Sequence, residues 1–375
     1  SFLYSLTWST PLTIFPVGLH DDDSLTTRPI GSGAFILPGD VAKDLKPGDP
    51  VPVLRNPDYW GVDNAGRQLP FVDGWTIYGM PDADTQRAAF RAKQLDNIDQ
   101  GAVGTPDQVA ALQKQFPGVR VGAWPQHPIA NTRIMMKLDH PILSNVNVRR
   151  ALSMAANRQD MIDISSGGAG IPVAPIPYPW MGRIWPLELH ELGPYYQYDP
   201  EEAKRLLAQE GYADGFEFEM IIASSNLVRQ YWADGFNLLG SNWEQVGVKF
   251  KMIPLEGGAF NPQWNTGQFN MGAFRCCIHV GSDLNAAGFD VWHTDGPYNR
   301  WGYSNAELDA LLDASVAEPD LLTRQAQARE INDFLVDQVT SLELYIPWII
   351  SMSHEYLVGN WDHLWGWTTA GGHGI

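Results

Sequence analysis

The sequence is poor in cysteine. Only two cysteines occur in 375 residues, and these two, Cys276 and Cys277, are adjacent. Neighbouring cysteines do not define a disulfide framework, so two buried thiols are favoured over a strained vicinal disulfide. No group of cysteine and histidine residues has the spacing of a zinc site. We therefore expect neither a metal nor a cofactor.

Basic charge is also scarce. The chain has 25 lysine and arginine residues against 43 aspartate and glutamate residues, which gives a formal net charge of -18. This balance repels phosphate backbones and anionic lipid, which argues against nucleic-acid binding and against charge-driven docking on a membrane. No stretch reaches the roughly 20 apolar residues of a membrane-spanning helix. The acidic run of residues 21–23 lacks the spacing and the glycine of a calcium loop.

Tryptophan, proline and glycine are plentiful by contrast. The chain has 15 Trp, 27 Pro and 36 Gly. Proline and glycine at this level predict many turns. Tryptophan side chains usually fill protein cores, but a flat indole can also form the wall of a ligand site, as in sugar-binding proteins. Composition alone therefore leaves both roles open for each tryptophan.

The periodicity of the apolar residues predicts an α/β protein. Residues 216–220 and 248–252 alternate between apolar and charged side chains, and 227–246 has the apolar spacing of an amphipathic helix. Strand, helix and strand in this order predict a βαβ unit with parallel strands. Further extended stretches are expected at residues 34–37, 51–55, 74–80, 269–280 and 342–350.

Capping signals place several helices. Helices are expected at residues 82–95, 145–156 and 321–339. Capping boxes predict three more helix starts, at Thr105, Asp199 and Ser304. Gly211 is the expected end of the helix that begins after Asp199.

A series of short motifs runs from Gly31 towards the C-terminus. The motifs are Gly-Ser-Gly-Ala-Phe at 31–35, Arg-Asn-Pro-Asp-Tyr-Trp-Gly at 55–61, Leu-Pro-Phe-Val-Asp at 69–73, Pro-Asp-Ala-Asp-Thr at 81–85, Val-Arg-Arg-Ala-Leu at 148–152 with Asn-Arg at 157–158, Tyr-Asp-Pro-Glu-Glu-Ala at 198–203 and Tyr-Ser-Asn-Ala-Glu-Leu-Asp at 303–309. In this order they resemble the signatures of the family 5 extracellular solute-binding proteins, the oligopeptide, dipeptide and nickel binders of ABC importers. Several are turn or helix starters, so we expect most of these residues to form scaffold.

The resemblance implies a two-lobe α/β fold of the periplasmic-binding-protein kind, type II of the large cluster, with a hinge and the solute enclosed between the lobes. The first lobe is expected to comprise residues 1–125 and the second residues 126–346, with 347–375 returning to the first. About thirty residues precede Gly31, where the family carries a longer segment. The N-terminal part of the first lobe and its extra subdomain are therefore expected to be missing.

On this resemblance, the chain is expected to capture a small polar organic solute and deliver it to a membrane ABC permease. The expected protein is a periplasmic or extracellular monomer without enzymatic activity, and a lipid anchor through the missing N-terminus is left open. A glycosidase and a solute sensor are the alternatives. A glycosidase needs two carboxylates at a defined separation. Glu217 and Glu219 instead alternate with apolar residues, which predicts the solvent face of a strand.

The resemblance also implies which stretch of the chain lines the ligand pocket. In this stretch the sequence departs from the pattern of the peptide-binding members. In peptide-binding members, the strand that matches residues 269–280 carries Trp-Cys-x-Asp, and its aspartate holds the α-amine of the ligand. Here Cys276 stands in place of the tryptophan and His279 in place of the aspartate. A buried amine without a carboxylate loses a charge-assisted contact. The departure disfavours an ordinary peptide and favours an oligosaccharide, an opine-like molecule or another polar solute.

The candidate ligand-binding residues come from this stretch and from strand ends. Asn226 follows a predicted strand, where α/β sheets bind ligands. A guanidinium at Arg229 can hold a carboxylate, and Asp283 can replace the missing amine ligand. Trp348 lies near the expected lobe crossing. The full set is Asn226, Arg229, Arg275, Cys276, Cys277, His279, Asp283 and Trp348.

Overall fold

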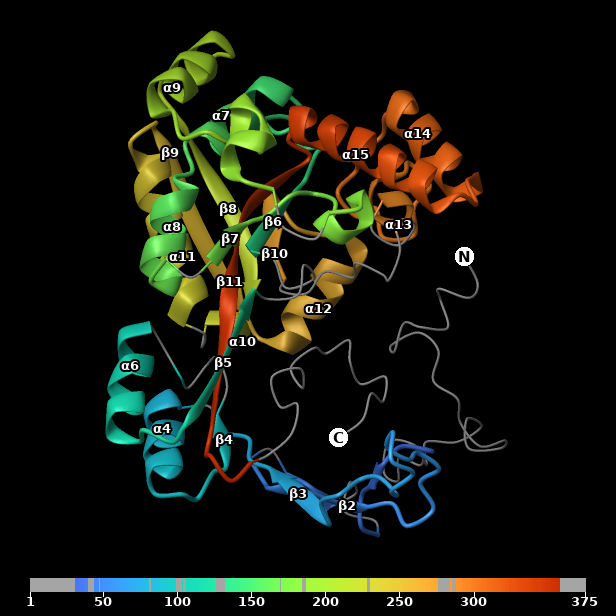
Figure 1. Cartoon of the computed structure of the whole chain (residues 1–375). Helices are drawn as coiled ribbons and strands as arrows, with labels where there is room; N and C mark the ends of the chain where they lie inside the picture. The colour runs from blue at the N-terminus through green and yellow to red at the C-terminus, as the bar shows by residue number, and fades with distance from the viewer. Residues whose placement is uncertain are drawn as a thin grey trace. The chain divides into compact units, whose positions relative to one another are not determined.

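The computed structural model divides the chain into two compact units (Figure 1). Unit 1 comprises Ser1–Val103, Phe116–Gly122 and Ser351–Ile375, and unit 2 comprises Gly104–Gln115 and Ala123–Ile350. The structure describes residues 31–39, 44–46, 48–80, 82–98, 103, 106–125, 132–168, 170–183, 187–227, 230–275, 284 and 288–357.

Unit 1 contains a three-stranded antiparallel sheet in the order β1-β2-β3. Its strands are β1 (Phe35–Ile36), β2 (Val51–Arg55) and β3 (Gly74–Ile77). Cross-strand partners share a face, and on one face the rings of Phe35 and Trp75 meet edge to face at 6.1 Å. Trp75 is nevertheless 49% exposed and Ile77 46% exposed. The sheet therefore keeps considerable apolar surface in contact with solvent.

Helix α4 (Ala83–Arg91) packs against a later segment of unit 1, around His354. The Asp82 side chain caps the helix by accepting the Thr85 amide at 2.7 Å. Phe90 is fully buried and stacks on the ring of His354 at 4.2 Å. After α4, β4 (Asn97–Ile98) pairs antiparallel with Met352 and Ser353. These contacts join two segments that are some 260 residues apart.

Unit 2 is built on a mixed sheet in the order β11-β6-β10-β8-β9. The strands are β6 (Thr132–Met136), β8 (Phe216–Ala223), β9 (Val248–Leu255), β10 (Gly272–Phe274) and β11 (Ser341–Ser353), with β5 (Arg120–Pro125) and β7 (Gly170–Pro172) also pairing with β11. β8 runs parallel to both β9 and β10, whereas β6 runs antiparallel to β10 and β11. The predicted βαβ unit is confirmed.

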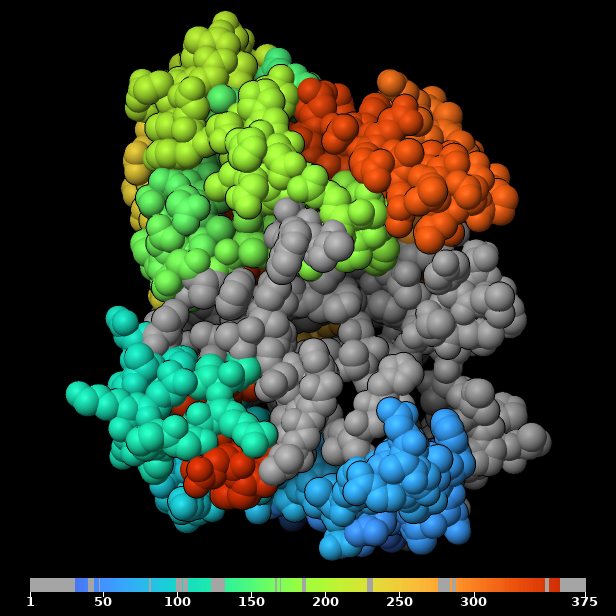
Figure 2. All heavy atoms as spheres, viewed as in Figure 1, coloured from blue at the N-terminus to red at the C-terminus, as the bar shows by residue number. Residues whose placement is uncertain are grey.

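The helices of unit 2 lie partly against this sheet, as α11 and α12 do, and partly against one another (Figure 1). They are α6 (Pro106–Gln115), α7 (Val146–Met154), α8 (Arg158–Ser166), α9 (Pro200–Gln209), α10 (Ser224–Leu227), α11 (Gln230–Glu244), α12 (Gly257–Thr266), α13 (Asp290–Trp292), α14 (Ala306–Ala317) and α15 (Leu321–Gln338), with short 3-10 turns at Tyr178–Met181, Leu189–Leu192 and Pro194–Tyr196. α11 packs against β9 and α8, and α7 packs against α9. α14 and α15 pack together and form a continuous surface (Figure 2).

Tryptophan fills the core of unit 2. Trp232, Trp243, Trp292 and Trp301 are at most 1% exposed. The indole N–H of Trp243 donates to the Leu152 carbonyl at 2.9 Å, and that of Trp301 donates to the Val291 carbonyl at 3.0 Å. Buried indoles of this kind combine a large apolar area with a satisfied polar group. These four tryptophans therefore pack the core of unit 2.

Most helix and strand predictions are confirmed, but several boundaries are wrong. The strand expected at 74–80 ends at Ile77, and the described part of the strand expected at 269–280 is only Gly272–Phe274. α14 begins one residue later than predicted, because the side chain of Asn305 accepts the amides of Glu307 and Leu308 and acts as the cap in place of Ser304. α4 ends at Arg91 rather than at Leu95. There Lys93 takes a left-handed conformation, with φ of 59°, and the chain turns back.

A buried ion pair lies where β6 and β11 meet. Arg133 Nε is 2.5 Å from Glu343 Oε1, and the two side chains are 2% and 0% exposed. The Ser341 hydroxyl also donates to Glu343 Oε1 at 2.5 Å, and the Arg133 guanidinium donates to the Pro175 carbonyl at 3.0 Å. Two charges this deep cost desolvation energy that their attraction and these hydrogen bonds must offset. Removing either side chain would therefore leave the other as an unpaired buried charge.

We predict that Glu343→Gln lowers the free energy of unfolding by about 3–5 kcal/mol, because it leaves the Arg133 charge buried without its counterion. The double variant Arg133→Met with Glu343→Leu should be more stable than Glu343→Gln. Urea denaturation of both variants and the wild type measures this. A double variant less stable than Glu343→Gln would contradict the prediction.

Candidate functional site

The carboxyl ends of three parallel strands meet at one edge of the unit 2 sheet. Ala223 at the end of β8 pairs with Leu255 at the end of β9, and Ile222 pairs with Phe274 at the end of β10. The register brings the residues after these strands to a common edge, where α10 and α12 begin (Figure 1). In open α/β sheets, this edge is where ligands bind.

Polar groups collect at this edge. The Ser224 hydroxyl donates to Glu256 Oε1 at 3.0 Å, which links the ends of β8 and β9. Asn226, in α10, is only 9% exposed. Arg275 follows β10 directly and is partly buried. A hydroxyl, an amide, a carboxylate and a guanidinium from neighbouring strand ends suit a polar organic ligand, which needs a few fixed hydrogen-bonding groups.

Two of the candidate residues predicted from the sequence, Asn226 and Arg275, are thus placed at the same strand edge. Trp348 lies within β11, but its side chain is outside the described part of the structure. The other candidates lie outside the described residues: Arg229, Cys276, Cys277, His279 and Asp283. Glu256 was missed. The strand-end rule that selected Asn226 applies equally to Glu256, because Glu256 directly follows β9.

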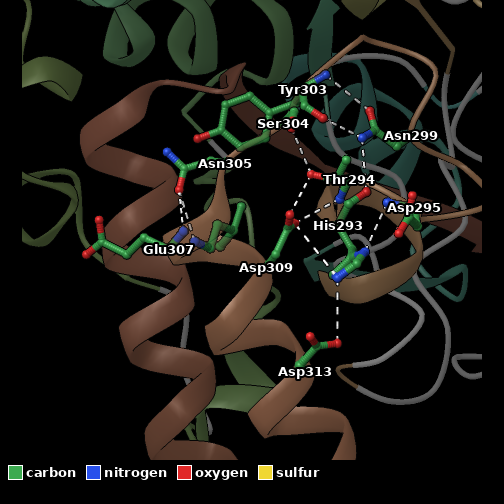
Figure 3. Close-up of polar contacts among 11 residues, drawn as sticks. His293, Thr294, Asp295, Asn299, Tyr303, Ser304, Asn305, Glu307, Asp309 and Asp313 are labelled. Carbon is green, nitrogen blue, oxygen red and sulfur yellow. Dashed lines mark hydrogen bonds and ion pairs between the residues drawn. The ribbon is translucent and has the colours of Figure 1, made fainter.

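A second polar cluster lies elsewhere in unit 2, between α13 and α14 (Figure 3). The Thr294 amide donates to Asp309 Oδ1 at 2.8 Å, and the Thr294 hydroxyl donates to Asp309 Oδ2 at 2.5 Å. His293 Nε2 lies 3.9 Å from Asp309 Oδ1 and 3.6 Å from Asp313 Oδ1. The His293 ring also stacks on Phe289 at 4.2 Å. A serine, a histidine and aspartates close together raise the question of a catalytic triad.

The hydrogen bonds assign this cluster a structural role. The Asp295 amide donates to His293 Nδ1 at 3.0 Å, so the ring proton of a neutral His293 is on Nε2 and points towards the carboxylates. The Ser304 hydroxyl lies 3.0 Å from the Thr294 hydroxyl and, within the described part of the chain, forms no hydrogen bond to the imidazole. A nucleophile needs a base within hydrogen-bond reach. The cluster instead ties the loop after α13 to the first turns of α14.

Among the described residues, no group of three or more histidine, cysteine, aspartate or glutamate side chains is arranged to hold a metal ion. Within the same part of the chain, no helix combines the length and the apolar character that crossing a bilayer requires. Glu217 and Glu219 lie on the exposed side of β8, where both carboxylates face Lys251. Their predicted place on a solvent face is confirmed.

A family model described as bacterial extracellular solute-binding proteins, family 5 Middle, matches residues 4–288. The match covers well over half of the chain. The chain therefore belongs to the family 5 bacterial extracellular solute-binding proteins, as the ordered motifs indicated.

The chain matches only part of the length of its individual relatives. Heme-binding protein A of Haemophilus influenzae is 28% identical over 318 residues, which make up 81% of this chain and 53% of that protein. Glutathione-binding protein GsiB of Salmonella typhimurium is 23% identical over 348 residues, or 89% of this chain and 62% of that protein. The chain thus spans about half to three fifths of these relatives.

Solved structures confirm the fold. The periplasmic binding protein DppA from Helicobacter pylori, in complex with the peptide STSA, superposes with a TM-score of 0.73 at 20% identity and covers 91% of this chain and 62% of its own. The binding protein AgaA of A. tumefacien R10, in complex with agropinic acid, gives 0.70 at 19% identity and covers 91% and 66%. The expected α/β fold of the two-lobe periplasmic-binding-protein kind is confirmed.

We predict that Asp309→Ala lowers the free energy of unfolding by about 1–3 kcal/mol, because the Thr294 amide and hydroxyl lose a charged acceptor. Asp313→Ala is the matched control. Asp313 is also near His293 but is 67% exposed, so its removal should change stability by less than about 0.5 kcal/mol. Urea denaturation measures both variants. Loss of solute binding by Asp309→Ala without loss of stability would contradict the structural role.

Proposed function

We propose that this protein is an extracytoplasmic solute-binding protein that captures a small polar organic solute and delivers it to a membrane ABC importer. The observation that carries the proposal is the match to the family model over residues 4–288. The polar groups of Ser224, Asn226 and Glu256 at the carboxyl edge of parallel strands support it, since they suit a solute with several hydrogen-bonding groups. Capture and release would follow from closure about a hinge.

The class of solute is proposed from the relatives and from the sequence. The relatives are named for heme, for glutathione and for di- and tripeptides, and solved structures hold peptides or agropinic acid. A peptide-like or opine-like solute is therefore favoured, although His279 stands where peptide binders carry an aspartate. The case for an oligosaccharide is weaker, because four of the tryptophans that suggested it fill the core of unit 2.

The remaining features of the proposal come from the family. The lobes would comprise residues 1–125 with 347–375, and 126–346. The protein would act outside the cytoplasm as a monomer, with an ABC permease as its membrane partner and without enzymatic activity. Arg229, Cys276, Cys277, His279, Asp283 and Trp348 stay candidate ligand-binding residues beside Asn226 and Arg275.

We predict that one or more members of a panel of peptides, glutathione, hemin and oligosaccharides raise the melting temperature and are recovered chemically unchanged. A solute at a hundred times its Kd stabilises the folded state by about 2.7 kcal/mol. Differential scanning fluorimetry measures the shift, and mass spectrometry of the recovered solute detects turnover. Chemical conversion of the solute would overturn the proposal in favour of an enzyme.

A second prediction tests the departure at residue 279. His279→Asp restores the carboxylate that peptide-binding members use for the α-amine, so the variant should bind a free-amine tetrapeptide at least tenfold more tightly than the wild type does. The N-acetylated tetrapeptide should gain nothing. Isothermal titration calorimetry compares the two, with His279→Asn as a neutral control. Equal gains for both peptides would show that residue 279 does not face the amine.

A further inference from the structure

The imidazole of His293 is buried directly after α13 and has no part in the proposed solute capture. The residue is 8% exposed, and its ring stacks on that of Phe289 at 4.2 Å. Polar groups lie beside both of its ring nitrogens (Figure 3). Histidine is the side chain whose charge ordinarily changes near neutral pH. A buried histidine with polar partners on both sides is therefore a place where a proton can change the structure.

The two ring nitrogens of His293 have different partners. Nδ1 accepts the Asp295 amide at 3.0 Å. Nε2 faces two carboxylates of α14, at 3.6 Å from Asp313 Oδ1 and 3.9 Å from Asp309 Oδ1. In a neutral imidazole one nitrogen donates and the other accepts, so this arrangement requires the single proton on Nε2. The neutral ring therefore suits both of its sides.

A second proton suits only one of these sides. It would go to Nδ1, because an imidazolium is a donor at both nitrogens. Nδ1–H would then face the N–H of Asp295, so that two donors meet and the hydrogen bond is lost. On the other side the proton is favourable, because the ring becomes a cation beside Asp309 and Asp313. Protonation thus breaks a contact within the turn and strengthens the contact with α14.

The charged residues of the segments that contact the ring are almost all acidic. They are Asp290 and Asp295 on the segment of His293 itself and Glu307, Asp309 and Asp313 on α14. The basic residue at the end of the turn, Arg300, lies with its Cζ 5.2 Å from the centre of the Tyr298 ring. A positive imidazole would therefore lie mainly among negative charges, which favour it.

The turn that contains Asp295 is anchored on both sides. Before it, the Thr294 amide donates to Asp309 Oδ1 at 2.8 Å. After it, the indole N–H of Trp301 donates to the Val291 carbonyl at 3.0 Å within the core. Neither of these bonds involves the imidazole. Loss of the Asp295 contact can therefore rearrange the turn without unfolding α13 or α14.

We propose that His293 makes the turn after α13 a pH-sensitive switch. The neutral ring keeps the turn closed by accepting the Asp295 amide. A proton on Nδ1 releases this amide, and Asp313 and Asp309 then hold the charged ring. The turn is closed in the neutral form, which prevails at higher pH, and opens as the pH falls. This regulation goes beyond solute capture and does not depend on it.

The first test measures hydrogen exchange of single amides by NMR at about pH 8 and about pH 5, a range in which imidazole titrates. Each rate is corrected for the intrinsic effect of pH on exchange. The protection of the Asp295 amide should fall about tenfold at the lower pH, as expected for the loss of one hydrogen bond. The Tyr298 amide, which donates to the Asp290 carbonyl at 2.8 Å, is the internal control. Constant protection of Asp295, or an equal fall at Tyr298, would overturn the proposal.

The variant His293→Asn separates the switch from a purely structural contact. The side-chain oxygen of asparagine takes nearly the place of Nδ1 and accepts an amide, but it does not gain a proton. Protection of the Asp295 amide in this variant should therefore be the same at both pH values, whatever its absolute level. If the wild-type fall persists in His293→Asn, the imidazole is not its cause and the switch is wrong.

A second variant tests the carboxylate side without changing the ring. Asp313→Asn removes the carboxylate nearest to Nε2, and Asp313 is 67% exposed, so the fold should tolerate the change. The charged ring loses a partner, so protection of the Asp295 amide should fall less at the lower pH than in the wild type. Glu307→Gln is the matched control, because it removes another exposed carboxylate of α14. Equal behaviour of the two variants would contradict the role of Asp313.

The protonation state of the ring gives an independent readout. Long-range heteronuclear NMR of the imidazole should show the proton of His293 on Nε2 at about pH 8 and protons on both nitrogens at about pH 5. A proton on Nδ1 at the higher pH, or a ring that stays neutral at the lower pH, would overturn the proposal. A ring that titrates while the Asp295 amide keeps its protection would overturn it as well.

Discussion

Strand β11 pairs with strands from widely separated parts of the sequence, and buried arginines donate hydrogen bonds to carbonyls on it and just before it. The strand runs through Ser341–Ser353 and pairs in turn with β6, β7 and β4. Just before it, Arg149 donates to the carbonyls of Gln338 and Val339 at 2.8 and 3.0 Å. Within it, Arg158 donates to the Glu343 carbonyl at 2.7 Å. Burial lowers the pKa of both arginines to about 10, so both stay charged at neutral pH.

These arginines also explain why two of the family motifs are recognisable. Arg149 belongs to the Val-Arg-Arg-Ala-Leu motif and Arg158 to the Asn-Arg pair. Each guanidinium donates to several backbone carbonyls, among them those of Leu143 and Gln338 for Arg149 and those of Tyr196 and Glu343 for Arg158. A lysine could not supply the same fork of donors. Removing such a group would leave buried carbonyl oxygens unpaired. In these two motifs, the arginines thus fix the course of the chain.

The sequence predicted what depends on local patterns and missed what depends on distant contacts. Alternation located β8 and β9, and the strand-helix-strand order predicted their parallel pairing. The cap of α14 was misplaced by one residue, because Ser304 and Asn305 are both good caps. In the fold, the Ser304 hydroxyl lies beside that of Thr294, and Asn305 accepts the first amides of the helix. Asn226 was found from its place after a strand. Glu256 follows β9 in the same way, but its hydrogen bond to Ser224, which comes after β8, is seen only in the fold.

The buried arginines of the scaffold share one kind of environment. Where arginines in this chain serve structure, they are neutralised or bonded to carbonyls: Arg133 by Glu343, Arg150 by Asp337, Arg158 by a ring of backbone oxygens. Burying a charge without such partners is strongly unfavourable, so these guanidinium groups can be buried only where carboxylate or carbonyl oxygens already converge.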